Sequence, residues 1–574
     1  MRTFLSPNDP LGFGLGDYIE VFAIALLAIV IAGWALAPRF RNLISSGSRL
    51  WIPIFAILPV VLRVLLLHRS PAPIPSGADD FSFILLADTL RHFRLSNPPV
   101  PFAEFFEQVF VLQRPTHSSM YPLGQGLFLA LGWLVFGHPW AGVLLSVAAF
   151  SAACYWMLRG WTSPRWALAG GLLAGLQFGP LSYWANCYWG GAASGTAGCL
   201  VFGALPRLAR NFRSRDAVLL GCGLSLQLLT RPFEFCFLLL SAVLFLPLAA
   251  RERFDWRCVR RAVISASLPL FAALALTGLH NKGVTGSWTT LPYMLYRYQY
   301  GMPATFTFQP NPTPHRQLSE EQDLAYRAQS AIHGTDPETL STYAERLTFR
   351  VRFLRFFLLP PLYAAVFAFL FKVGDPRFAW VLGTIGLFLL GSNFYPYFFP
   401  HYVAAITGLF VLASVVGLGQ LDKLRIHGHA LPFRLGSLLL LLCVVHFAFW
   451  FGLHASCSRS LQSALLPFES WDYINYGDPQ GRIAVHDELA RLPGKKLVFV
   501  HYAPGHRFEE WIRNEAELDQ APVVLVHDLG RNENSKLLTY FHDRTPWLLE
   551  PDQSPPRLRL TRYLPAQTGF QSVP

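Results

Sequence analysis

The chain has 574 residues, of which 52% are hydrophobic and only 14% are charged, against about 25% charged residues in an ordinary soluble domain. Its net charge is +12, its mean hydropathy is +0.34, and it is rich in Phe and Trp. This composition excludes a disordered chain, a collagen-like chain and a compact cytosolic enzyme, and it predicts an α-helical polytopic membrane protein. A dozen spans would use about 240 residues, so more than half of the chain would lie outside the bilayer.

Basic residues fall in short clusters between the apolar runs, a pattern typical of cytoplasmic loops. Nucleic-acid binding is not expected, because no signature of a nucleic-acid-binding fold accompanies the charge. The eight cysteines show no metal-type spacing or disulfide framework, and no cleavable signal peptide is expected. The clustered residues are Arg39, Arg41 and Arg49; Arg207, Arg210, Arg213 and Arg215; and Arg251, Arg253, Arg257, Arg260 and Arg261.

Apolar runs long enough for helices predict 12 or 13 membrane crossings. If the basic clusters lie on the cytoplasmic side of the membrane, four stretches fall on the opposite, outer side: 69–120, 280–350, 393–401 and 455–574. The number of runs between residue 121 and the basic linker at 206 then conflicts with the predicted sides of these two loops. Either one member of the pair 122–136 and 141–158 does not cross fully, or one of the loops is assigned to the wrong side because its charge signal is weak. The runs are 18–36, 52–68, 122–136, 141–158, 166–183, 191–205, 216–231, 235–249, 262–279, 353–372, 378–392, 402–419 and 434–453.

The predicted organisation is an N-terminal span with a basic linker (1–50), a transmembrane domain (51–455) with outer loops 69–121 and 280–350, and a soluble C-terminal domain (456–574). The first outer loop begins with the proline-rich PAPIPSGADD, followed by an amphipathic helix near 81–95 and a second amphipathic stretch, FAEFFEQVFVL. Such segments can lie along the membrane interface. The second outer loop is longer than a passive connection requires.

The C-terminal domain is predicted to be a small α/β domain. The runs KLVFVHY (496–502) and VVLVHD (523–528) indicate buried strands, and NENSKLLTYF (532–541) indicates a helix opened by Asn532. WLLEPD and RLRLTRY indicate two further strands. Strands that alternate with helices in this way favour one layered α/β unit.

Asp79 and Asp80 lie just after the second span, between a proline-rich turn and the first amphipathic helix. A carboxylate at the membrane surface, partly shielded from water, can act as a general base that accepts a proton from an attacking hydroxyl. A second carboxylate beside it can raise its pKa or fix its position. The alternative is structural: either aspartate could cap the helix that follows.

Several cations and aromatic residues downstream could contact a phosphate or a sugar. Arg114 and His117 precede a proline-led apolar helix, where they could hold a phosphate or satisfy loop carbonyls. In SYWANCYWGG, the side chains of Asn186, Tyr188 and Trp189 suit a sugar, although Tyr and Trp also form membrane-interface belts.

Charged residues inside apolar segments normally face a protein interior or a cavity. Arg231 and Glu234 interrupt an apolar stretch at i, i+3 spacing beside Pro232, so they could form a structural salt bridge or provide a phosphate-binding Arg. Two further groups lie at predicted outer helix ends, where an aromatic girdle is the alternative interpretation: Tyr293 and Arg297, and His401 and Tyr402.

Taken in this order, the features resemble the GT-C class of polytopic glycosyltransferases, which includes the lipid A aminoarabinose transferases and the protein O-mannosyltransferases. The resemblance depends on Asp79-Asp80 in a long first outer loop, on the stretch HSSMYPLGQGLFLALGWLVFGHPWAG, and on the order of the apolar helices. It covers about residues 50–410. The segments YWGG, TRPFE, VTG...LPY and PHY look like marks of a bacterial subgroup.

The resemblance implies transfer of a sugar from a polyprenyl-phosphate donor to a lipid, glycan or protein acceptor at the periplasmic face of the bacterial inner membrane. In such a mechanism an Asp base, Asp80 or alternatively Asp79, takes the proton of the acceptor hydroxyl, and in-line displacement inverts the anomeric centre. Cations would stabilise the departing phosphate: Arg231, Arg297, His117, His401 and Arg114. Sugar or acceptor contacts would come from Glu234, Tyr188, Trp189, Asn186, Tyr293 and Tyr402.

Metal dependence and other functions remain open at this point. Some members of the class use a divalent metal near the first-loop acids, but no spacing in this chain demands one, so no metal or other cofactor is predicted. The main alternative function is a transporter or flippase for a lipid-linked or polar solute, although no inverted repeat is visible. A membrane scaffold without chemistry is the third possibility.

Overall fold

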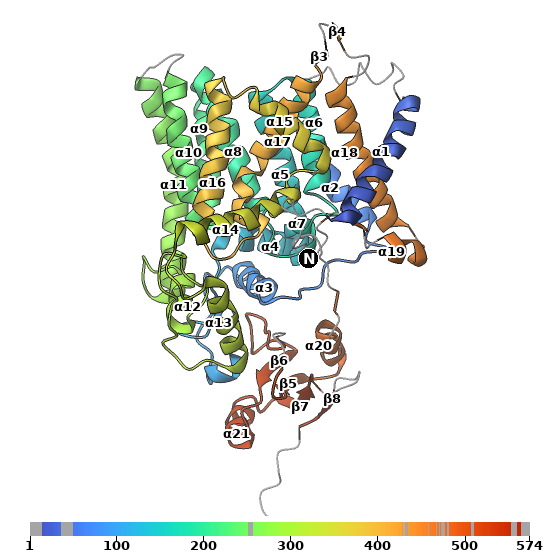
Figure 1. The fold of residues 1–574 in the computed structure, drawn as a ribbon. Helices are drawn as coiled ribbons and strands as arrows, with labels where there is room; N and C mark the ends of the chain where they lie inside the picture. The colour runs from blue at the N-terminus through green and yellow to red at the C-terminus, as the bar shows by residue number, and fades with distance from the viewer. Residues whose placement is uncertain are drawn as a thin grey trace, which may run out of the picture.

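The computed structural model describes residues 14–35, 50–250, 256–426, 429–430, 434–456, 458–465, 468–469, 471, 477–478, 481–506, 510–552 and 559–563. The basic residues Arg39, Arg41, Arg49, Arg251 and Arg253 of the sequence analysis lie outside these ranges. A bundle of helices forms the larger part of the molecule, and the loop helices and a small sheet domain gather at one end of it (Figure 1). We call this end the loop face.

Every predicted apolar run coincides with a helix, which confirms a mostly helical, multi-span membrane architecture. The local reason is composition, since long apolar segments satisfy their backbone polar groups within a helix. The helices are α1 (Leu15–Ala35), α2 (Trp51–Leu65), α4 (Leu123–Phe136), α5 (Pro139–Trp161), α6 (Pro164–Gln177), α8 (Ala192–Arg210), α9 (Ser214–Thr230), α10 (Pro232–Ala250), α11 (Trp256–Thr285), α15 (Pro360–Leu370), α16 (Pro376–Ser392), η5 (Pro400–Ile406) continued by α17 (Thr407–Leu421), and α18 (Leu435–Ala455).

Fewer helices than predicted are long and apolar enough to cross a membrane by themselves. Among the described residues four qualify, Pro139–Trp161, Val259–Thr285, Pro400–Leu421 and Leu435–Ala455, and a bent pair of helices around residue 358 makes a fifth. The predicted 12 or 13 crossings exceed this number because many helices of the bundle are short. A helix of 14 residues, such as α6, is about 21 Å long, whereas the hydrocarbon core of a bilayer is about 30 Å thick.

Helix α4 explains why the number of predicted crossings between residues 121 and 206 conflicts with the predicted sides of the loops. Pro122, just before α4, and Gly137, just after it, border two cavities that both lie at the loop face, the second against the C-terminal domain. α4 therefore starts and ends on the same side and does not cross. A side chain at Gly132 or Gly142 would collide with the backbone of the other helix, so these two glycines allow α4 to lie directly against α5.

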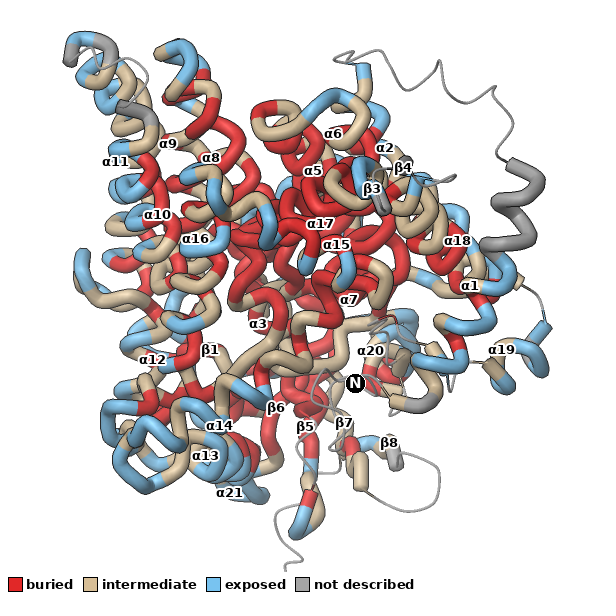
Figure 2. The backbone as a smooth tube through the Cα atoms, turned by 45° about the horizontal axis from the view of Figure 1, so that its top comes forward, coloured by how far each residue is buried: buried red, intermediate tan, exposed pale blue. Residues whose placement is uncertain are grey.

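Burial shows which helices form the interior of the bundle (Figure 2). Of the apolar window in η5 and α17, 94% is buried, against 6% of the window in α11. α17 is therefore the central helix, and α11 is a peripheral one whose apolar side chains are available to lipid. This contrast is expected when one helix of a bundle is surrounded by protein and another borders the bilayer.

The loop face is built from the two predicted outer loops. The first contains α3 (Ala78–Arg91), η3 (Ala103–Phe106) and the antiparallel pair β1 (Val111–Leu112) and β2 (Ser118–Ser119). The short helix α7 (Tyr183–Asn186) follows α6. The second outer loop contains α12 (Pro292–Tyr300), α13 (Glu320–His333), α14 (Leu340–Val351) and η4 (Arg352–Phe356).

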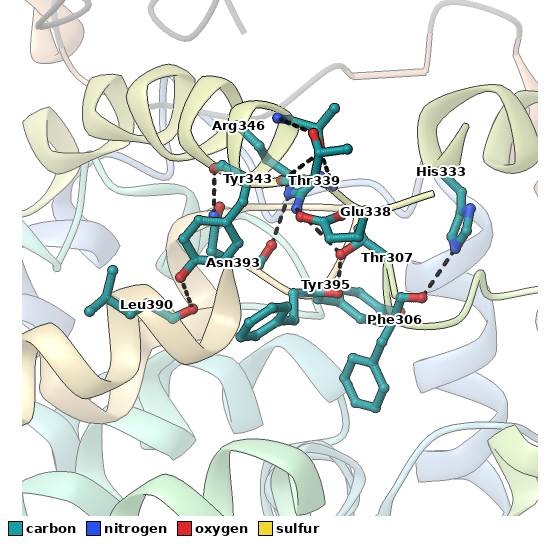
Figure 3. A network of polar contacts seen from close by, with 12 residues as sticks. Phe306, Thr307, His333, Glu338, Thr339, Tyr343, Arg346, Leu390, Asn393 and Tyr395 are labelled. Atoms are coloured by element: carbon teal, nitrogen blue, oxygen red, sulfur yellow. Dashed lines mark hydrogen bonds and ion pairs between the residues drawn. The ribbon is translucent and has the colours of Figure 1, made fainter. Parts of the chain in front are cut away.

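A network of polar contacts attaches the second outer loop to the end of α16 (Figure 3). Arg346 of α14 donates from Nε to the carbonyl of Asn393 over 2.8 Å, and the Asn393 side-chain amide donates to the carbonyl of Tyr343 over 2.9 Å. The network also holds Phe306 and Tyr395 beside each other, with ring centroids 6.4 Å apart. Both of these rings line the cavity described below.

The C-terminal domain is a small α/β unit, as predicted. Its four-stranded sheet has the order β6-β5-β7-β8, in which β5 pairs in parallel with both β6 and β7 and β8 is antiparallel to β7. The elements are α20 (Arg482–Arg491), β5 (Lys495–Val500), β6 (Val523–His527), α21 (Arg531–Tyr540), β7 (Arg544–Glu550) and β8 (Arg559–Arg562).

One face of this sheet is covered by the first outer loop. Phe105 and Phe106 of η3 are both 0% exposed and pack in one cluster with Leu497, Phe499 and Val526 of the sheet. The stretch FAEFFEQVFVL therefore does not lie along the membrane interface as predicted. Its phenylalanines pack into the core of the C-terminal domain instead, where burying them removes more apolar surface from water.

Phe106→Ala is expected to reduce the free energy of unfolding of the C-terminal domain by about 3 to 5 kcal/mol, because it opens a cavity in a closed core. Limited proteolysis over a temperature series would measure the loss. Phe93→Ala is the matched control, since Phe93 lies in the same loop and is 89% exposed. Equal protease resistance of both variants would contradict the shared core.

Candidate active site

A cavity of about 360 Å³ opens at the loop face, where both outer loops meet the ends of the bundle helices. It is bordered by α3, by the turn between α9 and α10, by α12 and by the segment that leads into η5. Its lining combines one carboxylate of the first outer loop with two arginines and many aromatic rings. The lining residues include Asp79, Tyr121, Trp189, Arg231, Glu234, Tyr293, Arg297, Tyr395, His401 and Tyr402.

The two adjacent aspartates have different surroundings. Successive helical residues point about 100° apart, so only one of them faces the cavity. Asp79 lines it. Asp80 is 4% exposed and caps α3, because its carboxylate accepts hydrogen bonds from the backbone N–H groups of Ser76 (3.1 Å), Gly77 (3.3 Å) and Tyr188 (3.0 Å).

Of the two, Asp79 is therefore the aspartate in a position to meet a substrate. Burial raises the pKa of Asp80 to about 6, although its three backbone hydrogen bonds act in the opposite direction. The structure gives Asp80 the capping arrangement that the sequence left open as an alternative. The sequence predicts Asp80 as the base with Asp79 as the alternative, whereas the geometry favours Asp79.

Tyr121 lies beside Asp79 and fixes its carboxylate. Its hydroxyl donates a hydrogen bond to Asp79 Oδ1, and its ring stacks on Phe83 with centroids 4.1 Å apart. Burial raises the pKa of Asp79, while the hydrogen bond from Tyr121 and the positive charge of Arg231 both lower it. A carboxyl with a raised pKa is a better match for proton abstraction near neutral pH than an exposed one.

Tyr121→Phe is expected to move the acidic limb of the pH profile of kcat/KM to higher pH. The lost hydrogen bond lowers the pKa of Asp79 in the wild type, so its removal raises that pKa, and the active carboxylate then forms only at higher pH. On the acidic side kcat/KM should fall about fivefold, which corresponds to about 1 kcal/mol for one hydrogen bond. A pH series of initial rates checks this, and an unmoved limb would show that Tyr121 does not act on the base.

Two arginines supply positive charge to the cavity. Arg231 follows the last residue of α9, where Pro232 starts α10. Its Nη1 lies 3.4 Å from Glu234 Oε1, and its guanidinium lies 4.8 Å from the centre of the Tyr402 ring. Arg297 on α12 donates from Nε to the carbonyl of Pro303 over 3.0 Å. Both guanidinium groups are held by protein contacts and line the cavity.

Aromatic rings form another part of the cavity wall. The imidazole of His401 stacks on the ring of Tyr402 with centroids 4.7 Å apart, and the ring of Trp189 meets it edge-on at 5.0 Å. Nδ1 of His401 lies 3.3 Å from the Tyr183 hydroxyl. Stacked rings of this kind offer an apolar surface to the C–H face of a sugar.

Two of the predicted phosphate-binding residues lie away from this cavity. His117 is 2% exposed, and its Nδ1 lies 2.9 Å from Gln113 Oε1. Burial lowers the pKa of His117 to about 4, so it is neutral. Arg114 is an exposed residue whose carbonyl accepts a hydrogen bond from Gln299. Neither residue is among those that border the cavity.

Two predicted sugar contacts hold the loops together instead. Asn186 accepts a hydrogen bond from Arg63 Nε over 2.9 Å, and Arg63 also donates to the carbonyls of Ser70 and Pro71. The Tyr188 hydroxyl donates to the carbonyl of Pro73 over 2.9 Å. These contacts fix the proline-rich turn before Asp79, and neither Asn186 nor Tyr188 borders the cavity.

Three residues of the loop face, Arg63, Tyr121 and Tyr395, were not expected from the sequence. Arg63 is 0% exposed, and its position as the only charged residue of an apolar run could have revealed it by the same reasoning that singled out Arg231. Tyr121 and Tyr395 gave no such signal, because Tyr is common at membrane interfaces. Within the described ranges no group of three or more His, Cys, Asp or Glu side chains is placed to hold a metal ion.

The fold and the cavity define a helical multi-span membrane protein with a small mixed-sheet domain, in which the outer loops and the ends of the bundle helices enclose a charged, aromatic-lined site. No protein-family model matches the chain, and no curated protein matches it.

Solved structures of GT-C class enzymes are similar to the chain at low sequence identity, as the sequence resemblance predicted. ArnT from Cupriavidus metallidurans in the apo state is 13% identical, with 90% of this chain and 98% of that chain covered and a TM-score of 0.48. The same ArnT bound to undecaprenyl phosphate is 12% identical, with 87% and 93% covered and a TM-score of 0.48. The oligosaccharyltransferase AglB from Archaeoglobus fulgidus, in complex with an inhibitory peptide and a dolichol-phosphate, is 12% identical, with 88% and 69% covered and a TM-score of 0.39.

Proposed function

We propose that the protein is an integral membrane glycosyltransferase that moves a sugar from a polyprenyl-phosphate donor to the hydroxyl of a lipid, glycan or protein acceptor. The observation that carries the proposal is that Asp79, Arg231 and Arg297 border one cavity together with a wall of aromatic rings. A base, two phosphate-binding cations and a sugar-stacking surface are the groups that such a transfer needs.

The reaction joins the acceptor oxygen to the anomeric carbon of the donor sugar. Asp79 accepts the hydroxyl proton as that bond forms, and the bond from the anomeric carbon to the phosphate oxygen breaks with its electron pair leaving on the phosphate. Arg231 and Arg297 stabilise the negative charge that develops there. Attack opposite the leaving group inverts the anomeric centre.

The aromatic wall serves the sugar in this proposal. Trp189 and Tyr402 flank the imidazole of His401, and Tyr293 lies beside Arg297 with its ring 5.4 Å from the guanidinium. Glu234 holds Arg231. The neutral tyrosines and the tryptophan are suited to hydroxyl and C–H contacts, because they add no charge that would compete for the phosphate.

A lipid-linked donor fits the expected orientation of the chain in the bacterial inner membrane. Nucleotide sugars are made in the cytosol, so a site on the periplasmic side requires an activated sugar that has already been moved across the bilayer. The cavity lies at the end of the helix bundle, where a polyprenyl chain could remain in lipid while its phosphate reaches Arg231. No metal is part of the proposed mechanism.

The test is a transfer assay with purified full-length protein and polyprenyl-phosphate donors that carry labelled hexoses or pentoses, incubated with membrane lipids as the acceptor pool. Release of polyprenyl phosphate together with label in a new product supports the proposal. The alternative function, a transporter or flippase, predicts movement of intact donor across proteoliposomes without cleavage of the sugar–phosphate bond. That result, from protein that is folded by thermal analysis, would overturn the proposal.

A further inference from the structure

A second cavity, of about 410 Å³, lies between the first outer loop and the C-terminal domain. Its membrane-side wall is formed by the proline-rich turn, by one face of α3 and by the turn between α4 and α5. Its other wall comes from the start of α20 and the segment 513–515. We call it the interdomain cavity. Its volume falls in the range of about 300 to 1,000 Å³ that is usual for ligand sites.

The interdomain cavity is separate from the proposed active site. On α3, Asp79 and Phe83 border the active-site cavity, whereas Phe81 and Ile84 border the interdomain cavity. The hydrogen bond of 3.0 Å between the Tyr188 N–H and the Asp80 carboxylate lies in the wall between them. The two cavities have no lining residue in common.

The boundary between the two cavities also passes between residues 188 and 189. Tyr188 borders the interdomain cavity, while its neighbour Trp189 borders the active-site cavity. One short segment therefore contributes an aromatic residue to each cavity. A ligand in the interdomain cavity would lie close to the active site without entering it.

The lining of the interdomain cavity offers hydrogen-bond donors, acceptors and an apolar floor. Arg513 and His486 provide donors, and Asp487 and Glu515 provide carboxylate acceptors. The guanidinium of Arg513 lies 5.3 Å from the centre of the Phe81 ring and donates to the carbonyl of Arg482 over 3.1 Å. This arrangement leaves further N–H groups of the Arg513 fork for a ligand.

The charge of this lining selects against an anion. One arginine is opposed by two carboxylates, and Asp487 lies 3.5 Å from His486 Nδ1. The apolar part includes Ile74, Pro75, Phe81 and Trp133. Donors, acceptors and a flat apolar surface, without an excess of positive charge, suit a neutral molecule with many hydroxyl groups.

We propose that the interdomain cavity binds a neutral saccharide unit, namely a part of the acceptor that lies away from the reacting hydroxyl. The assignment of this saccharide to the acceptor rests on the proposed function, whereas binding itself does not. The C-terminal domain then contributes directly to acceptor recognition, because Arg513, His486 and Asp487 all belong to it.

The experiment measures monosaccharide binding to the full-length protein in detergent by saturation-transfer NMR. The probes are glucose, mannose, galactose and N-acetylglucosamine, with inorganic phosphate as the anionic probe. At least one monosaccharide should bind with a Kd of about 1 to 10 mM, and Arg513→Gln should weaken this binding at least about tenfold, which corresponds to the loss of a charged hydrogen-bond donor. Arg531→Gln, an exposed arginine at the start of α21, is the matched control and should bind as the wild type does.

Ile483→Trp provides a second variant in case Arg513→Gln does not fold. It fills the cavity from the C-terminal wall and should also abolish binding. Asp79→Asn should bind the saccharide normally while losing transfer, so failure of the proposed function can be distinguished from failure of this inference. The inference is overturned if no monosaccharide binds, if binding survives both Arg513→Gln and Ile483→Trp, or if phosphate binds in place of the saccharides.

Discussion

Asp79→Asn is expected to lower the rate of sugar transfer by about 10²- to 10⁴-fold, the usual contribution of a general base. The side-chain amide has the shape of the carboxylate and can still accept the hydrogen bond from the Tyr121 hydroxyl, but it cannot take a proton from the acceptor. The fold and the two arginines proposed to bind the donor phosphate are left intact. Initial rates of transfer and the affinity for polyprenyl phosphate, measured on the same purified protein, should show lost turnover with retained binding.

Asp80→Asn is the informative control for this prediction. Asp80 accepts three backbone N–H groups, and an amide can turn only one oxygen toward them, so buried donors lose their partner at about 1 to 3 kcal/mol each. We therefore expect Asp80→Asn to lower thermal stability, with a smaller loss of transfer per folded molecule than Asp79→Asn. If Asp80→Asn is stable and inactive while Asp79→Asn is active, the base has been assigned to the wrong aspartate.

Arg231→Gln is expected to reduce kcat/KM for the polyprenyl-phosphate donor by about 10- to 100-fold, which corresponds to about 1.5 to 3 kcal/mol for a hydrogen bond to a charged group. Glutamine keeps polar contact with Glu234 but carries no positive charge for the phosphate. Competition binding with polyprenyl phosphate measures the loss in the ground state, and the transfer rate measures the loss in the transition state.

Glu234→Gln separates a functional Arg231 from a merely structural ion pair. The ion pair between Arg231 and Glu234 has a distance of 3.4 Å. If it serves only to neutralise the two charges inside the protein, Arg231→Gln and Glu234→Gln should lower stability and donor binding to the same extent. If Arg231 binds the phosphate, Glu234→Gln leaves that charge in place and should retain donor affinity. Arg377→Gln is the control for a general loss of positive charge, because Arg377 lies at the start of α16 with its side chain 50% exposed.

Local features of the sequence were sufficient for most of the secondary structure. The apolar runs became helices, and the strands at 496–502 and 523–528 became β5 and β6 with ends within two residues of the prediction. Contact between Arg231 and Glu234 was one of the two alternatives that the sequence allowed, because i, i+3 residues share one face of a helix. These features depend on neighbours within about one helical turn, which the sequence displays directly.

The site itself depended on contacts between distant segments. The Asp79 carboxylate is bound by Tyr121, 42 residues away, and Asp80 by Tyr188, 108 residues away. Which aspartate faces the cavity follows from how α3 is rotated against those partners, and a short amphipathic pattern does not fix that rotation. The same limit applies to His117, whose ring was expected near a phosphate but is buried against Gln113.

The sequence by itself determined that this is a helical multi-span membrane protein with a small α/β domain, because hydrophobicity and the two backbone periodicities act over a few residues. Only the tertiary structure decided that α4 returns to the side it started from, that Phe105 and Phe106 complete the core of the C-terminal domain, and that Asp79 shares a cavity with Arg231. Each of these facts results from packing between segments far apart in the chain, and packing is selected by the whole set of buried surfaces at once.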